Sequence, residues 1–236
     1  LARGVRQPAL ARRVIGLGTG ATTGGAGVPI AAHAASGDAV SARPPWRAWV
    51  AVAVLYALCA VGGWWMPRAT LDWQPSLLGT QPWRLLTPIG VHYGSAHLIA
   101  NLAGVALAAA YGVVGLVPAR IALAWLASWP LTHLALLARP DLLHYGGLSG
   151  VLHAGVAAAT VWLGVRAQTG AQRAVAAVVA TGLILKVVGE QPWGPALRQV
   201  AGWDFPVAPL VHATGVLAGT ACALASIAIG RRRGDG

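Results

Sequence analysis

Charged residues are scarce in this chain, and their scarcity excludes an ordinary soluble domain. Only 10% of the 236 residues are charged, 56% are hydrophobic, and 17 basic residues stand against six acidic ones. A soluble domain normally carries far more charge on its surface. The composition therefore favours a membrane protein, and the distribution of the charge becomes the informative feature.

Cysteine is equally scarce. Cys59 and Cys222 are the only two, and both lie inside apolar segments. This excludes a disulfide framework or a thiolate cluster, and we interpret both as small hydrophobic side chains. No basic patch alternates with aromatic residues that could stack on bases, so the net charge of +11 does not indicate nucleic-acid binding. We interpret it as membrane topology and attraction to anionic membrane lipids.

Six runs are long and apolar enough to span a bilayer, which requires about 20 mainly apolar residues. They cover residues 46–65, 95–115, 120–138, 148–166, 172–189 and 208–230. Trp46 and Trp49 at one end of the first run, with Trp64 and Trp65 at the other, are typical of aromatic anchors at the two membrane surfaces. The sequence thus predicts an all-α membrane protein with six spans.

The basic residues orient these spans. Six spans place both termini on one side, and that side receives twelve of the 17 basic residues. These are Arg3, Arg6, Arg12, Arg13, Arg43, Arg47, Arg120, Arg166, Arg173, Arg231, Arg232 and Arg233. Positive charge accumulates in the cytoplasm, so both termini are predicted to be cytoplasmic.

Two segments outside the spans differ in character. Residues 1–45 are rich in Gly, Ala and Arg and predict a flexible basic cytoplasmic tail, with a transit peptide as the alternative. Residues 66–94, between the first two spans, combine four prolines with Trp73 and Trp83. We expect this long loop to be associated with the outer leaflet of the membrane.

Two polar residues open apolar spans at matching depth. Ser149 begins the fourth span and His212 the sixth, and polar groups at such positions are costly enough to indicate function. Gly215 and Gly219 continue the face of His212 and permit another helix to approach closely. We therefore predict a serine nucleophile and its histidine base within hydrogen-bond reach.

The sequence offers no obvious acid to complete a triad. Asp141 and Asp204 fall in predicted outer loops and Glu190 at the end of a span, so a Ser–His dyad is the interpretation. His97 and Asn101 lie four apart on one face of the second span. Both can donate hydrogen bonds, which suits them to stabilise an oxyanion.

The pattern resembles the rhomboid intramembrane serine proteases. Four segments carry the resemblance: Trp83-Arg84, the H-x4-H-x3-N of His92, His97 and Asn101, the G-x-S-G of 147–150, and the H-x2-G-x3-G of 212–219. It implies a six-helix rhomboid protease domain over 46–236, with a membrane-associated outer loop between the first two helices.

The resemblance also implies roles. Ser149 would be the nucleophile, His212 the general base, and His97 and Asn101 the oxyanion hole with the backbone N–H of Ser149. Such a serine endopeptidase needs no metal and no cofactor. The location implied is the bacterial inner membrane, with the active site facing the periplasm.

One residue departs from the usual rhomboid pattern and indicates a subfamily. His153 stands where most rhomboids carry a tyrosine, and the run from Gly147 to His153 is similar to the rhombosortase subfamily. That resemblance implies single-span substrates with a GlyGly-CTERM sorting tail. His153 and Gly147 would position the catalytic histidine or the substrate. A general rhomboid protease with other substrates and an inactive, client-binding rhomboid-like protein are the alternatives.

A metal or haem protein that uses the outer histidines is a further alternative. His92 and His97 are five residues apart, about 140° around a helix, so on a helix they would not share a face. No acidic or thiolate ligand accompanies them, which disfavours this reading.

Overall fold

Helices account for the regular structure of the described chain. The computed structural model describes residues 44–203 and 205–233, and these contain no β-strand. Almost all of the predicted tail, 1–45, lies outside the described residues. The long helices are α1 (Arg47–Trp64), α3 (Ser95–Val114), α4 (Ala119–Leu134) with its extension η4 (Ala135–Ala138), α5 (Ser149–Arg166), α6 (Gly170–Gly189) and α7 (Pro209–Arg232). Each lies within two residues of a predicted span at both ends.

The all-α class is confirmed, while the count of six spans stays a prediction. Within the described residues, five helices are long and apolar enough to cross a membrane: α1, α3, α4 with η4, α6 and α7. α5 occupies the predicted fourth span but is not among them. α5 carries Ser149, His153 and Arg166, which lower the hydropathy of its 18 residues.

α5 lies at the centre of the bundle, where it packs against α3, α4, α6 and α7. Its small residues permit this, because a Cβ at Gly155 would lie 2.4 Å from the ring of Trp125. Trp125 is fully buried, stacks on Trp49, and donates its indole N–H to the carbonyl of Val151 at 2.8 Å. A hydrogen-bonded aromatic core therefore holds α5 in register with α4.

The contact between α5 and α7 is made by backbone against backbone. A Cβ at Gly215 would lie 2.0 Å from the carbonyl oxygen of Gly150, and one at Gly219 would lie 2.1 Å from that of Ala154. Side chains at these positions would force the helices apart. The predicted glycine contact is confirmed, and it brings together the first turns of both helices, which carry Ser149 and His212.

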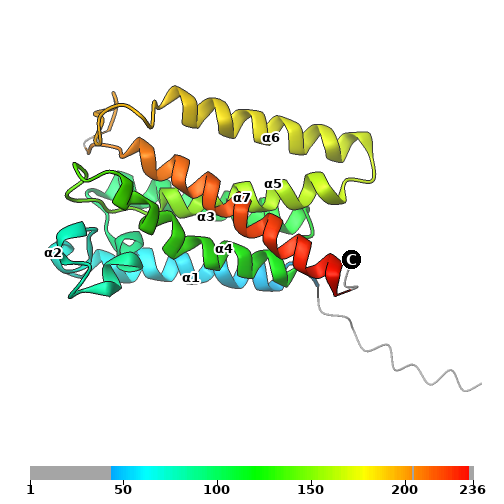
Figure 1. The fold of residues 1–236 in the computed structure, drawn as a ribbon, viewed down its shortest axis with the longest axis horizontal. Helices are drawn as coiled ribbons and strands as arrows, with labels where there is room; N and C mark the ends of the chain where they lie inside the picture. Colours follow the sequence, from blue (N-terminus) through cyan, green and yellow to red (C-terminus); the bar gives the residue numbers. More distant parts are fainter. Residues whose placement is uncertain (1–43, 204, 234–236) are drawn as a thin grey trace, which may run out of the picture. The chain divides into compact units, whose positions relative to one another are not determined.

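α6 is held much more loosely. Only Ala176 is buried along its length, and Figure 1 places α6 along one side of the bundle. Its N-terminus is capped by Thr169 and Gln172 in a capping box. Most of its apolar side chains are exposed in the bundle, which is typical of a helix that faces a bilayer.

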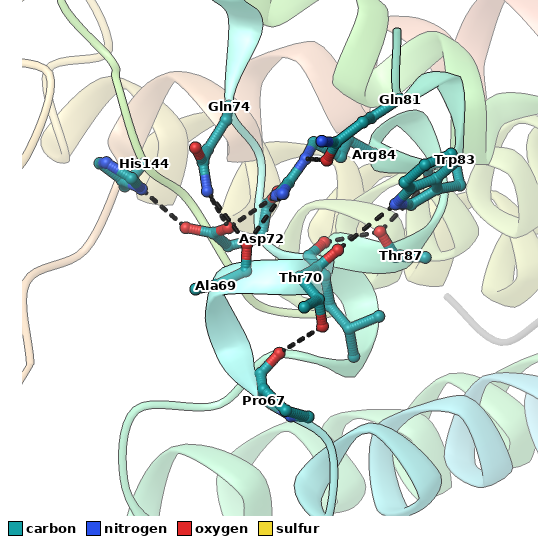
Figure 2. Close-up of polar contacts among 11 residues, drawn as sticks. Pro67, Ala69, Thr70, Asp72, Gln74, Gln81, Trp83, Arg84, Thr87 and His144 are labelled. Atoms are coloured by element: carbon teal, nitrogen blue, oxygen red, sulfur yellow. Dashed lines mark hydrogen bonds and ion pairs between the residues drawn. The ribbon is translucent and has the colours of Figure 1, made fainter. Parts of the chain in front are cut away.

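The loop between α1 and α3 is folded rather than extended. It contains α2 (Arg68–Leu71), η1 (Pro75–Leu77), η2 (Pro82–Leu85) and η3 (Thr87–Gly90). The buried guanidinium of Arg84 joins η2 to α2, since it donates to the Asp72 carboxylate at 2.9 Å and the carbonyl of Ala69 at 2.8 Å (Figure 2). A buried ion pair with several further hydrogen bonds makes this loop a rigid unit.

The same loop fixes the segment that leads into α5. His144 Nδ1 donates to Asp72 at 2.7 Å (Figure 2), and the backbones of Trp73 and Tyr145 pair as an isolated bridge. The N–H of Gly147 donates to the carbonyl of Pro88 at 2.8 Å. Three tethers therefore set the position from which Ser149 begins its helix.

Basic side chains lie near one end of the bundle. In Figure 1 the start of α1 and the end of α7 lie together, and the loop with α2 lies at the other end. Near the first end, the guanidinium groups of Arg120 and Arg166 lie 5.1 and 5.3 Å from the ring centre of Trp162. The grouping agrees with the predicted topology, whereas the side of the membrane stays a prediction.

Candidate active site

Ser149 and His212 meet across the contact between α5 and α7. Ser149 is the first residue of α5, and its Oγ lies 2.9 Å from Nε2 of His212, in the first turn of α7. His212 is only 4% exposed. The distance is that of a hydroxyl donating to an imidazole nitrogen, the arrangement expected of a nucleophile and its base. The predicted pairing of these two residues is thus found in the structure.

An acid also reaches the histidine, so the expectation that none is available is wrong. Glu190, directly after α6, places Oε2 at 2.5 Å from Nδ1 of His212. The chain turns back after α6, which brings Glu190 beside a residue 22 positions later. Asp141 behaves as expected, since it pairs with Arg139 in an exposed loop, and Asp204 lies outside the described residues.

The contacts of Glu190 favour its ionised form. Burial by itself would raise the pKa of its carboxyl group, but the hydrogen bonds and charges of His212 and Lys186 outweigh burial and hold that pKa well below its usual range. Lys186, one turn earlier on α6, donates to Oε1. The sequence did contain a signal for Glu190, because a charged pair four residues apart, here Lys186 and Glu190, is unusual at the end of an apolar span.

The ring of His153 packs against the face of the His212 imidazole. Its ring stacks on His212 with centroids 4.2 Å apart and planes at 14°. Its Nδ1 donates to the carbonyl of Ser149 at 2.7 Å, which holds the ring in place. Among the roles open from the sequence, the structure places His153 as a stacking partner of His212, and it also lines the cavity described below.

His97 and Asn101 lie on the facing turn of α3. Asn101 is 4% exposed, and its Nδ2 has no hydrogen-bond partner within the described part of the chain. His97 accepts a long hydrogen bond at Nδ1 from the N–H of Tyr93 and stacks on Phe205. A buried amide donor without a partner is costly unless a ligand uses it, so the pair suits a developing negative charge.

Gly147 makes room for one of these donors. Its φ of +139° favours glycine, and a Cβ there would lie 3.0 Å from Nε2 of His97. The structure thus places Gly147 against His97, the proposed oxyanion donor, while Tyr145 donates its hydroxyl hydrogen to the Gly147 carbonyl.

The remaining outer histidines have structural contacts. His133, on α4, lies 2.7 Å from the carbonyl of Leu85 and so joins the loop to the bundle. His92 lies 3.4 Å from the carbonyl of Gly90, a contact within the loop. The helical angle between His92 and His97 does not apply, because His92 precedes α3. Their rings meet edge to face at 4.9 Å. Within residues 44–203 and 205–233 no three potential metal ligands gather.

The polar groups line a cavity of about 630 Å³. Its walls come from α3, α5, α6 and the segment before α7, and most are apolar. They include Ala100, Gly104, Leu107, Leu152, Val156, Leu183, Leu197, Val200, Trp203, Phe205 and Val207. The site therefore combines a few polar groups with a mostly apolar space that fits an apolar chain segment.

Comparison of the chain with models of known protein families found no match, and comparison with curated proteins found none either. The chemical interpretation therefore depends on this chain's own residues and their geometry.

Proposed function

We propose that the protein is an intramembrane serine endopeptidase of the rhomboid type. One observation carries the proposal, the 2.9 Å contact between Ser149 Oγ and His212 Nε2 beside an apolar cavity. It joins two motifs 63 residues apart, each of which would mean little alone. The six spans, with α5 as the fourth, and an active site facing the bacterial periplasm belong to this proposal.

The geometry supports a conventional acyl transfer. His212 accepts the hydroxyl proton as Ser149 Oγ attacks the scissile carbonyl, and the protonated imidazole then returns that proton to the leaving amine. Asn101 and His97 stabilise the oxyanion, together with the first backbone N–H groups of α5, which have no partner inside the helix. Water then hydrolyses the acyl-enzyme with the same base.

The cavity supports an apolar, single-span membrane protein as the substrate. The narrower proposal, a GlyGly-CTERM sorting tail, is supported only by the similarity of residues 147–153 to rhombosortases. A general rhomboid protease with other transmembrane substrates is the second reading. Incubation with a panel of tailed and untailed single-span proteins separates these two readings.

A fluorophosphonate probe tests the central proposal. The purified protein in detergent should be labelled at Ser149, and Ser149→Ala and His212→Ala should each abolish labelling. A serine positioned only for helix packing would not react. Absence of labelling at Ser149, together with no cleavage of any substrate in the panel, would overturn the proposal in favour of a client-binding protein. Such a protein would keep its biological function in Ser149→Ala.

A further inference from the structure

We propose that Glu190 is a positioning residue for His212, so that Ser149, His212 and Glu190 act as a hydrogen-bonded triad drawn from α5, α7 and the end of α6. The inference rests on the proposed protease function and goes beyond the dyad that the motifs alone imply. Its basis is the continuous row of contacts from Oγ through both imidazole nitrogens to the carboxylate.

The row of contacts selects one tautomer. A carboxylate 2.5 Å from Nδ1 requires a proton on that nitrogen, which leaves Nε2 free to accept the hydroxyl proton of Ser149 at 2.9 Å. A neutral imidazole otherwise exchanges between two tautomers, and only one of them can act as the base. Stacking on His153 restrains the plane of the ring, whereas the carboxylate decides its protonation.

The environment keeps the carboxylate charged and aimed. Lys186 donates to Oε1, so the two carboxylate oxygens are divided between the ammonium and the imidazole. Arg198 donates to the backbone carbonyl of Glu190 at 3.1 Å and so holds the residue from the loop side. The side chain of His212 is 6% exposed and that of Glu190 is 24% exposed, so the charge acts through little water.

A purely mechanical role must be separated from this one. α6 has little buried surface, so the Glu190–His212 contact could serve only to hold the end of α6 on α7. A clamp of that kind would change stability when broken, but would leave the pH dependence of the chemistry unchanged. A positioning carboxylate stabilises the imidazolium formed during attack and therefore affects the pH dependence.

The test uses Glu190→Gln in the full chain, with Asp141→Asn as a control that removes a carboxylate from an exposed loop. The rate of fluorophosphonate labelling at Ser149 is measured across pH, with melting temperature as the structural readout. We expect labelling to slow by about 10² to 10⁴-fold in Glu190→Gln. Its acid limb should move to lower pH, since the imidazolium has lost its counter-charge. Asp141→Asn should match the native protein.

Labelling of Glu190→Gln within about threefold of native, with an unchanged pH profile, would overturn the inference and leave the serine protease proposal intact. Failure of the native protein to label would instead overturn both. A measurement on the native protein guards against a variant that does not fold. Nitrogen-15 NMR of the histidines should show His212 protonated at Nδ1, and a resting Nε2–H tautomer would contradict the triad.

Discussion

The α5–α7 pair and α6 show two different ways of building one site. α5 and α7 touch along their backbones, with Gly215 and Gly219 leaving no space for a side chain. α6 buries only Ala176, yet the residue that follows it supplies the carboxylate that reaches His212. The nucleophile and base thus belong to the most tightly packed contact, while the acid comes from the most loosely packed helix.

The two contacts of His212 should therefore differ in how well they tolerate substitutions nearby. The distance from Ser149 to His212 cannot be adjusted without moving two backbones, so it is defined by packing. The distance from Glu190 to His212 depends on a few hydrogen bonds at the end of a helix. Substitutions in the α5–α7 contact should therefore be far more damaging than equal substitutions on α6.

The largest effect is expected from Gly215→Val, matched with Gly182→Val on α6. A Cβ at Gly215 meets the Gly150 carbonyl, whereas one at Gly182 meets nothing within 4 Å. Separation of the helices by about 1 Å should slow labelling at Ser149 at least about 100-fold. Overpacking should also lower stability by about 1–3 kcal/mol. Gly182→Val should change neither quantity, and equal effects at both sites would contradict the comparison.

A middle-sized effect is expected at the stack on His212. His153→Ala removes a ring contact worth about 0.5–1.5 kcal/mol, so labelling should slow about 3- to 10-fold. His153→Phe keeps an aromatic ring at the position and should stay within about threefold of native. If both variants were equally slow, the hydrogen bond to the Ser149 carbonyl rather than stacking would be the function of His153.

The smallest effect is expected on the open side of α6. Leu185 is 66% exposed in the bundle, so Leu185→Ala should change stability by less than about 0.5 kcal/mol and leave labelling unchanged. Thermal unfolding in detergent, followed by circular dichroism, measures the change. A loss comparable to that of Gly215→Val would show that α6 packs against protein in the native membrane, for example in an oligomer.

Much of the fold could be predicted because each span can be recognised from its own residues. The helix boundaries follow from apolar runs interrupted by polar residues and proline, which are local features. The close approach of α5 and α7 could be predicted as well, since glycines at i and i+4 leave one face of a helix bare. The matching depth of Ser149 and His212 then placed them at the same contact.

By itself the sequence determined the all-α class, the six long helices and the facing of Ser149 and His212, because these depend on hydrophobic length and helical period. Only the tertiary structure decided that Glu190 reaches His212, that His153 stacks on it, and that His92 meets His97. The stack of His153 depends on how closely α5 and α7 pack. The other two contacts depend on the direction the chain takes after a helix ends or before one begins. Turns and loops carry no fixed period from which that direction could be calculated.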